Sequence, residues 1–200
     1  MRVVGGELRG RPLAAPRSDA IRPTSDRTRE AVFNIIAHSQ SVRLEGARVL
    51  DLFAGSGGIS LEFVSRGCSW ATCVEMNQAH ARFIKNTVRE LGLGSKIQVV
   101  RHNVFDFLKI CTRKYDLVFA DPPYDITGLE NLPAKILDAG ILTEDGILIL
   151  EHSAHYSFSG APSFVKEKKY GNVHFSFFAV SKTFPTFALP NNQGPVVQPG

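Results

Sequence analysis

The chain has 200 residues, about the length of one domain, which excludes a multidomain assembly. Hydrophobic residues make up 44% and charged residues 21% of it, so the chain can bury a sizeable core and is not an intrinsically disordered protein. The net charge of +4 indicates no partner by itself, but residues 1–30 contain seven Arg against four acids and carry most of that excess.

The N-terminal region predicts a basic hairpin followed by a helix. Residues 2–11 form two short extended runs around Gly5-Gly6, a dipeptide that tolerates the positive φ of a tight turn. Thr24 or Ser25 can cap the helix that follows, which has acids in its first turn. Its apolar stripe comprises Val32, Phe33, Ile35 and Ile36. We expect this helix to pack on the main domain with its Arg side facing out.

From Arg48 onward, short apolar runs alternate with amphipathic stretches. The runs are RVLDLF, ATCVE, KIQVVR, YDLVFA and GILILE. This alternation predicts βαβ units and a parallel sheet with helices on both faces. Two of the helices end at glycines, the first before Gly67 and the second, which starts near Gln78, before Gly92.

The last third of the chain has a different pattern. SFVKEKKYGNVHFSFFAV predicts two antiparallel strands joined at Gly171-Asn172. The tail from Thr183 is rich in Pro, Gly and Asn without a period, and we expect it to be disordered. The fold class predicted is therefore α/β, with a mostly parallel sheet closed by an antiparallel C-terminal hairpin.

The cysteines and the hydropathy pattern favour a cytoplasmic protein. Cys68, Cys73 and Cys111 include no C-x-x-C pair, so we expect reduced thiols and no disulfide framework. No apolar region follows the Arg near the N-terminus, and no run approaches the roughly 18 apolar residues that a membrane span needs. We expect neither export nor a membrane partner.

The first motif with chemical content is VLDLFAGSGGIS. A predicted strand ends near Asp51, and Gly55, Gly57 and Gly58 then form a turn that opens a helix, so that backbone can approach a ligand closely. The next strand ends in Glu75, whose carboxylate can accept hydrogen bonds from both hydroxyls of a ribose. The pattern indicates a nucleoside site, although such a turn can also be purely structural.

The second motif, Asp121-Pro122-Pro123-Tyr124, follows a strand and so lies on the same rim of the sheet. The prolines fix the backbone and remove two N–H donors, which leaves the Asp121 carboxylate and the Pro122 carbonyl as acceptors beside an aromatic ring. An exocyclic amino group on a flat base needs these features. The alternative is a Pro-Pro turn that merely ends a strand.

At these residues the chain resembles class I S-adenosylmethionine-dependent methyltransferases that act on nitrogen. A closer resemblance is to the RsmD family, bacterial methyltransferases of guanine N2 in 16S ribosomal RNA. It covers about residues 1–180 and rests on MRVVGGELRGRPL, IRPTSDRTREAVFNII, LDLFAGSGGISLEFVSRG, VEMN with the later Asn86, and DLVFADPPYD. It implies a Rossmann-like fold with a seven-stranded sheet, S-adenosyl-L-methionine as cofactor, and one guanine of the small ribosomal subunit as substrate.

The resemblance also implies residue roles. The cofactor-binding residues would be Asp51, Phe53, Gly55, Gly57, Glu75, Met76 and Asn103. Asp51 and the glycine turn would hold the methionine part, Glu75 the ribose, and Met76 would flank the adenine. The family usually has Asp where this chain has Asn103. The Asn103 oxygen can still accept from the adenine amino group, so we expect weaker cofactor binding at most. The catalytic residues would be Asp121, Pro122, Pro123 and Tyr124.

RNA docking is expected from the N-terminal arginines, since phosphate contacts position a protein without reading sequence. The candidates are Arg9, Arg11, Arg22, Arg27 and Arg29. A solvated helix face is the alternative for each. We divide the chain into a basic extension (1–40), a methyltransferase domain (41–182) and a tail (183–200), and expect a monomer that acts on 16S ribosomal RNA.

Two other groups of residues are expected to have no ligand. His152 and His155 lack a Cys or carboxylate at zinc spacing, so no metal is expected. Lys166, Lys168 and Lys169 fit an exposed edge strand better than a binding site.

Three other functions remain open at the sequence level. The tetrapeptide recognises an amine rather than one nucleobase, so DNA adenine or another RNA could be the substrate. A dinucleotide oxidoreductase would explain the glycine turn, but Ser60 stands where the third glycine of its G-x-G-x-x-G pattern belongs. A ribosome-assembly factor with a vestigial pocket would not need an intact Asp121–Tyr124 motif.

Overall fold

A computed structural model describes residues 2–13, 26–37, 42–123 and 126–181. Its elements are α1 (Asp26–Ala37), β1 (Arg48–Leu52), α2 (Gly58–Ser65), β2 (Trp70–Glu75), α3 (Gln78–Glu90), β3 (Ile97–Arg101), α4 (Val104–Ile110), β4 (Tyr115–Ala120), a 3-10 turn (Leu129–Asn131), α5 (Leu132–Asp138), β5 (Leu142–Ser153), β6 (Phe164–Tyr170) and β7 (Val173–Ala179). The predicted helix caps Thr24 and Ser25 and the predicted disordered tail lie outside the described residues.

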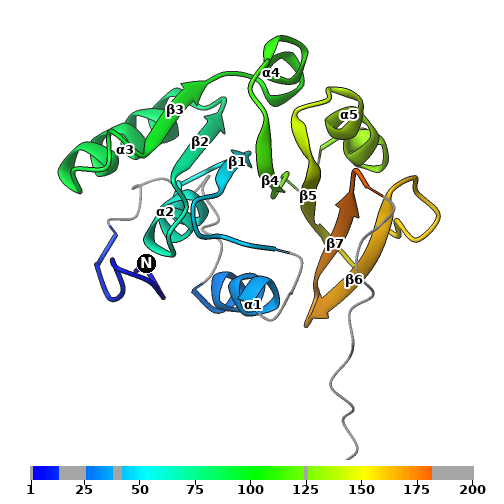
Figure 1. Cartoon of the computed structure of the whole chain (residues 1–200), viewed down its shortest axis with the longest axis horizontal. Helices are drawn as coiled ribbons and strands as arrows, with labels where there is room; N and C mark the ends of the chain where they lie inside the picture. The colour runs from blue at the N-terminus through cyan, green and yellow to red at the C-terminus, as the bar shows by residue number, and fades with distance from the viewer. Residues whose placement is uncertain (1, 14–25, 38–41, 124–125, 182–200) are drawn as a thin grey trace, which may run out of the picture.

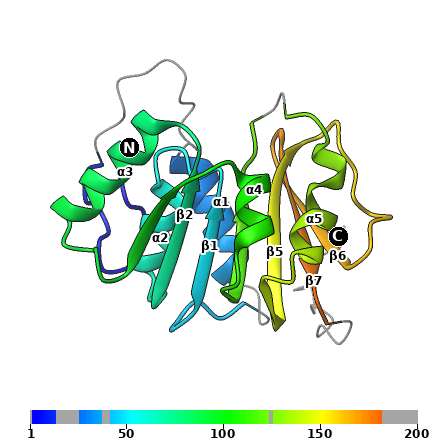
Figure 2. The ribbon, with the colours of Figure 1, turned by 90° about the horizontal axis from the view of Figure 1, so that it is seen from above.

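The strands form one seven-stranded sheet in the order β3-β2-β1-β4-β5-β7-β6 (Figures 1 and 2). The first five strands along the chain pair in parallel, whereas β7 is antiparallel to both β5 and β6. The predicted mostly parallel sheet with an antiparallel C-terminal hairpin is therefore confirmed, and Gly171 at the hairpin turn has the positive φ expected of it.

Helices cover both faces of the sheet, and alternating residues of each strand supply the two cores. Leu50 and Leu52 of β1 pack with α4 and α5, while Val49 packs with α1 and α2. A third cluster joins α2 and α3. Figure 1 shows α4 and α5 on one side of the sheet and α1 and α2 on the other. Within the described residues, no helix is long or apolar enough to cross a membrane.

Helix α1 is part of the main core. Its Val32, Phe33 and Ile36 are fully buried, and the Phe33 ring packs edge-on against Phe63 of α2 at 4.8 Å between centroids. The expectation that the Arg side of this helix faces out is wrong for Arg29, which is 1% exposed. Its Nη2 donates to the Arg2 carbonyl oxygen at 3.0 Å, because this face of the helix meets the N-terminal segment.

The N-terminal segment, residues 2–13, is an irregular loop rather than a regular hairpin. One antiparallel bridge joins Arg2 to Pro12, and the chain reverses over residues 5–10 instead of in a tight turn at Gly5-Gly6. The reason is that α2 binds this loop. Backbone N–H groups of Val4 and Glu7 donate to Glu62 Oε2 (2.8 Å) and to the Ser65 carbonyl (2.7 Å). A Cβ at Gly6 would collide with Ser65, so only glycine fits there.

Candidate functional site

The candidate site lies where the chain order of the sheet reverses. From β1 the chain proceeds outward through β2 to β3, then returns by α4 to β4 on the other side of β1. The loops after β1 and β4 therefore diverge at the carboxyl ends of two adjacent parallel strands, which is where open α/β sheets bind ligands. The backbone N–H of Asp121, which follows β4, lies 3.5 Å from the Leu52 carbonyl at the end of β1.

The glycine turn after β1 has an unusual backbone. Phe53 has a φ of 62°, and Gly55 and Gly57 have φ of 53° and 74°. A non-glycine residue with positive φ is strained, and such strain is concentrated at functional sites. A Cβ on Gly57 would lie 2.9 Å from the Ile84 side chain, so glycine allows α2 to pack closely on α3. The turn opens directly into α2 at Gly58.

Asp51, near the end of β1, is 2% exposed and accepts two hydrogen bonds from Ser60. Its Oδ2 is 2.7 Å from Ser60 Oγ and 3.1 Å from the Ser60 N–H. The pKa of Asp51 is raised to about 7, mainly by burial and also by the charges of Asp121 and Glu75, while the Ser60 bonds oppose the rise. Ser60 therefore fixes Asp51 beneath the glycine turn, a role that sequence analysis missed.

Glu75, the last residue of β2, links the glycine turn after β1 to the loop after β2 through hydrogen bonds. Its Oε2 accepts from the Gly55 N–H at 2.8 Å, and its Oε1 accepts from the Asn77 N–H at 2.7 Å. His80 Nδ1 lies 3.8 Å from Oε1. Because each carboxylate oxygen can accept more than one hydrogen bond, both keep capacity for hydroxyl donors. The geometry thus combines the predicted acid and the predicted glycine turn in one site.

Met76 and Asn103 lie together beside Glu75, on the loops after β2 and β3. Met76 is 64% exposed, and its Sδ is 3.7 Å from Asn103 Nδ2. Asn103 Oδ1 caps α4, accepting from the Phe105 N–H at 2.8 Å and the Asp106 N–H at 3.3 Å. The expected acceptor of Asn103 is therefore already occupied twice, and its amide N–H₂ points to Met76.

Of the second motif, Asp121, Pro122 and Pro123 belong to the described chain. They follow β4, as predicted, and Pro122 is buried while Pro123 is exposed. The Pro123 carbonyl accepts from the Ile126 N–H at 3.1 Å. Tyr124 lies outside the described residues.

Glu151 of β5 is a buried acid that the sequence analysis did not identify. Ala120 of β4 pairs with Leu150, so Asp121 and Glu151 follow side by side in register. Glu151 is 7% exposed, and its buried Oε2 has no hydrogen-bond partner among the described residues. Burial raises the pKa of Glu151 to about 9, with a further contribution from Asp121. Asp121 is therefore close enough to both Asp51 and Glu151 for its charge to raise the pKa of each.

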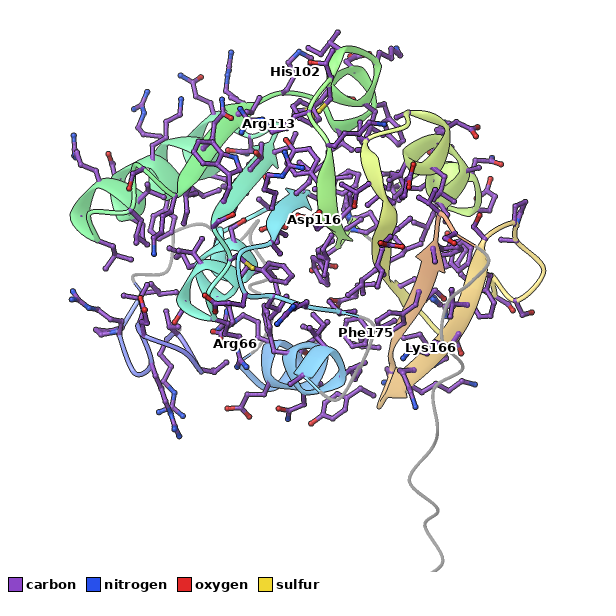
Figure 3. The ribbon with its side chains drawn as sticks, viewed as in Figure 1. Arg66, His102, Arg113, Asp116, Lys166 and Phe175 are labelled. Atoms are coloured by element: carbon purple, nitrogen blue, oxygen red, sulfur yellow. The ribbon has the colours of Figure 1, made fainter. Side chains whose placement is uncertain are left out.

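Among the five predicted RNA-binding arginines, the side chains that the structure describes differ in exposure. Arg9 and Arg11 are exposed on the N-terminal segment, whereas Arg29 is buried. Arg22 and the side chain of Arg27 lie outside the described residues. The N-terminal segment is held by the C-terminal end of α2, where Arg66 lies 4.7 Å from the Phe33 ring (Figure 3). Ser65, which accepts from the N–H groups of Glu7 and Leu8, is the last of the eight residues of α2 and lies about 12 Å along the helix axis from the glycine turn.

This sheet order, with a glycine turn after β1, an acid at the end of β2 and Asp-Pro-Pro after β4, defines a Rossmann-like fold of the class I methyltransferase type. A solved structure described as a putative methyltransferase from Escherichia coli, yhhF, has a TM-score of 0.77 and 31% identity, and the match covers 89% of this chain and 96% of that one. An S-adenosyl-L-homocysteine complex of a methyltransferase from Thiobacillus denitrificans shares the fold at a TM-score of 0.52 and 17% identity, covering 64% and 48% of the two chains.

Sequence comparison identifies the family within this class of methyltransferases. The model of the family described as "Conserved hypothetical protein 95" matches residues 1–179. Ribosomal RNA small subunit methyltransferase D of Escherichia coli is 33% identical over 181 residues, covering 89% of each protein. The putative rRNA methyltransferase YlbH of Bacillus subtilis is 34% identical over 155 residues, covering 76% of this chain and 82% of that protein. The chain belongs to this family, the RsmD family.

Proposed function

We propose that this protein transfers a methyl group from S-adenosyl-L-methionine to the exocyclic N2 amine of one guanine in 16S ribosomal RNA of the small subunit. The observation that carries the proposal is the position of Asp121-Pro122-Pro123 at the end of β4, beside the glycine turn whose Gly55 N–H donates to Glu75. The names of the relatives support a small-subunit ribosomal RNA as the substrate class. We further propose that it acts as a monomer in the cytoplasm.

The residues at the carboxyl rim fit the proposed cofactor. Both oxygens of Glu75 already hold a backbone N–H and keep lone pairs for the two ribose hydroxyls. Among the described residues, only the Phe53 carbonyl approaches the position of a Cβ on Gly55, so the turn leaves room above it. Met76 is exposed and can flank the adenine. When bound there, S-adenosyl-L-methionine supplies an activated methyl group on its sulfonium sulfur.

We expect Asn103 to face the adenine through its amide nitrogen rather than through its oxygen. Because its oxygen caps α4, the group that it can present is the N–H₂ beside Met76. That group donates, so it suits a ring nitrogen of the adenine rather than the adenine amino group.

Asp121 and Pro122 orient the target amine. The guanine amine is a poor nucleophile because its lone pair is delocalised into the ring. Hydrogen bonds from its two hydrogens to the Asp121 carboxylate and the Pro122 carbonyl increase the electron density on nitrogen and aim the lone pair. The Asp121 carboxylate then accepts the proton that the methylated nitrogen loses. Alignment of two bound reactants can remove roughly 7–11 kcal/mol of the barrier, which makes positioning the larger contribution.

Arg9 and Arg11 supply phosphate contacts for the RNA. Both are exposed, and the loop that carries them is fixed to α2 by hydrogen bonds from Val4, Glu7 and Leu8. Fixed arginines at a distance from the rim can position a nucleic acid without reading its sequence.

The test is incubation with radiolabelled S-adenosylmethionine and, in parallel, free 16S RNA, small-subunit particles from a strain that lacks the modification, or DNA. We expect label in RNA, and mapping of the modified nucleotide to N2 of a single guanine. Label in DNA adenine, or in RNA at another position, would overturn the guanine assignment. Calorimetry with S-adenosylhomocysteine and with NAD tests the cofactor, and preference for NAD would favour the oxidoreductase alternative.

Asp121→Ala tests the mechanism. We expect kcat to fall by about 10²–10³-fold, the cost of losing one oriented hydrogen-bonding group at a reacting centre. Asp121→Asn keeps an acceptor oxygen and is expected to retain part of the activity. Affinity for S-adenosylhomocysteine serves as the control, since Glu75 and the glycine turn are intact in both variants. Full methylation by Asp121→Ala would contradict the proposed role.

A further inference from the structure

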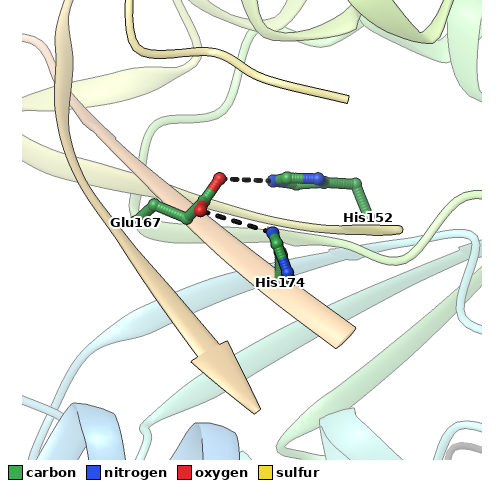
Figure 4. A group of neighbouring side chains, drawn as sticks. All are labelled: His152, Glu167 and His174. Atoms are coloured by element: carbon green, nitrogen blue, oxygen red, sulfur yellow. Dashed lines mark ion pairs between the residues drawn. The ribbon is translucent and has the colours of Figure 1, made fainter. Parts of the chain in front are cut away.

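The C-terminal hairpin brings two histidines and one glutamate together. In the register of β5 and β7, His152 lies opposite His174, and Glu167 of β6 pairs with Ser176, two residues further along β7. One ligand atom from each of His152, Glu167 and His174 lies within 4.8 Å of the others. Figure 4 shows both imidazole rings directed towards the Glu167 carboxylate.

The hydrogen bonds of His152 fix its tautomer. Its Nδ1 is 2.9 Å from the Ser153 carbonyl oxygen, which only accepts, so Nδ1 carries the proton. The neutral ring then has its lone pair on Nε2, which accepts from Ser176 Oγ at 2.8 Å and lies 3.8 Å from Glu167 Oε2. A backbone carbonyl that holds one ring nitrogen while the other is directed into a cluster is the usual support of a metal-binding histidine.

His174 gives an independent indication of a ligand. Its side chain is 10% exposed, and its buried Nδ1 has no hydrogen-bond partner among the described residues, although Glu167 Oε1 is 3.3 Å away. A buried polar atom without a partner is uncommon and requires an explanation. Its position at the Glu167 carboxylate means that a cation bound there would satisfy it.

From this arrangement we propose that His152 Nε2, His174 Nδ1 and the Glu167 carboxylate bind a zinc ion. Two imidazoles and one carboxylate are zinc ligands, with water completing a tetrahedron. In such a site the ligand atoms lie about 3.3 Å apart, given bonds of about 2.0–2.1 Å. His174 and Glu167 already have this separation, and the others, which are at most 4.8 Å, must shorten by no more than roughly 1.5 Å.

Adjacent groups permit this contraction. Lys169 Nζ lies 3.6 Å from Glu167 Oε1, but its side chain is 69% exposed and can turn away into solvent. For zinc to bind, the Ser176 hydroxyl only has to give up its hydrogen bond to His152 Nε2. Phe158 packs edge-on against the His152 ring at 4.9 Å between centroids and shields one side of the cluster.

Zinc at this position would connect β5, β7 and the edge strand β6. The three ligands come from these three strands, which close the sheet at its antiparallel end. The site uses none of the residues proposed for methyl transfer, so its function is to stabilise the hairpin. A ligand that binds the folded chain alone raises the free energy of unfolding.

The test uses the untagged full-length protein, stripped of metal with a chelator and then titrated with Zn²⁺ by calorimetry. We expect one Zn²⁺ per chain and a higher midpoint of thermal unfolding. Co²⁺ in place of Zn²⁺ should give the intense visible absorption of a four-coordinate site. Glu167→Gln and His174→Ala should each weaken binding by at least about 100-fold, because loss of a supporting hydrogen bond alone costs 10–100-fold.

Two further variants keep the test decisive. His155→Ala removes an exposed histidine of the same region that is not in the cluster, and should bind Zn²⁺ like the parent protein. Ser176→Ala frees His152 Nε2 and keeps all three ligands, so it should bind Zn²⁺ at least as tightly as the parent protein. This variant therefore still tests the site if a variant of one of the ligands fails to fold. The proposal fails if the parent protein binds no Zn²⁺ at millimolar concentration. It also fails if binding persists unchanged in Glu167→Gln and His174→Ala.

Discussion

Glu151 is the residue whose ionisation should dominate the pH dependence of stability. The unfolded chain ionises this carboxyl above a pKa of 4.5, whereas the folded protein holds the proton up to about 9. Between these values unfolding releases a proton, so the free energy of unfolding falls as pH rises, by up to about 1.4 kcal/mol per pH unit. Asp51, with its pKa raised from 3.8 to about 7, acts in the same direction over a narrower range.

Glu151→Gln tests this, because an amide stays neutral at every pH and has nearly the shape of the protonated acid. We expect the variant to match the parent protein near pH 4 and to exceed its free energy of unfolding by about 1 kcal/mol or more at pH 8. Urea unfolding at several pH values measures the difference. Glu144→Gln, at an exposed position of the same strand, is the control and should leave the pH profile unchanged. Parallel profiles for Glu151→Gln and the parent would refute the assignment.

At the scale of elements, α2 and its glycine turn position the site, and a pair of substitutions can separate two roles of glycine. Gly57 and Gly92 have similar positive φ, 74° and 68°. A Cβ on Gly57 meets Ile84, whereas one on Gly92 meets no described atom within 4 Å. Gly92→Ala should cost about 1–2 kcal/mol for the backbone conformation alone. Gly57→Ala should cost about 1–3 kcal/mol more, for overpacking against α3.

Chemical denaturation measures both costs. Affinity for S-adenosylhomocysteine adds a second readout, which should fall for Gly57→Ala and stay constant for Gly92→Ala. Equal stability of the two variants would show that the packing against Ile84 can relax without cost.

The sequence predicted those elements whose signals are local. Alternating apolar runs located β1 to β5, and Gly171-Asn172 located the hairpin, because strand period and turn chemistry depend on neighbouring residues. The glycine turn and Glu75 could be assigned to one site because strands of a parallel sheet end on one rim. Glu151 and the His152–Glu167–His174 cluster could not be predicted. They depend on the register between strands that are distant in sequence, and His155, the nearer histidine, lies outside the cluster.

At the scale of the whole molecule, the N-terminal segment and α1 are continuous with the catalytic core. Val3 and Leu13 are buried in the cluster that joins α2 and α3, and Phe33 in the cluster beneath β1 and β4. The proposed boundary between an extension and a domain therefore does not separate two hydrophobic cores among the described residues. A segment held in this way presents Arg9 and Arg11 at a fixed position relative to the proposed active site.

This arrangement predicts that Arg9 and Arg11 contribute to RNA affinity and not to cofactor affinity. Removal of one phosphate-binding arginine should reduce the slope of log K against log salt concentration by about 0.7–0.9. Arg9→Ala/Arg11→Ala should therefore bind 16S RNA more weakly at low salt, with a slope that is shallower by about 1.5. Filter binding at several salt concentrations measures the slope, and calorimetry with S-adenosylhomocysteine should give the same affinity as the parent.

Arg82→Ala/Arg89→Ala, which removes the same charge from exposed positions of α3, should leave the slope unchanged. Equal effects of the two double variants would mean that net charge, and not the fixed N-terminal segment, attracts the RNA.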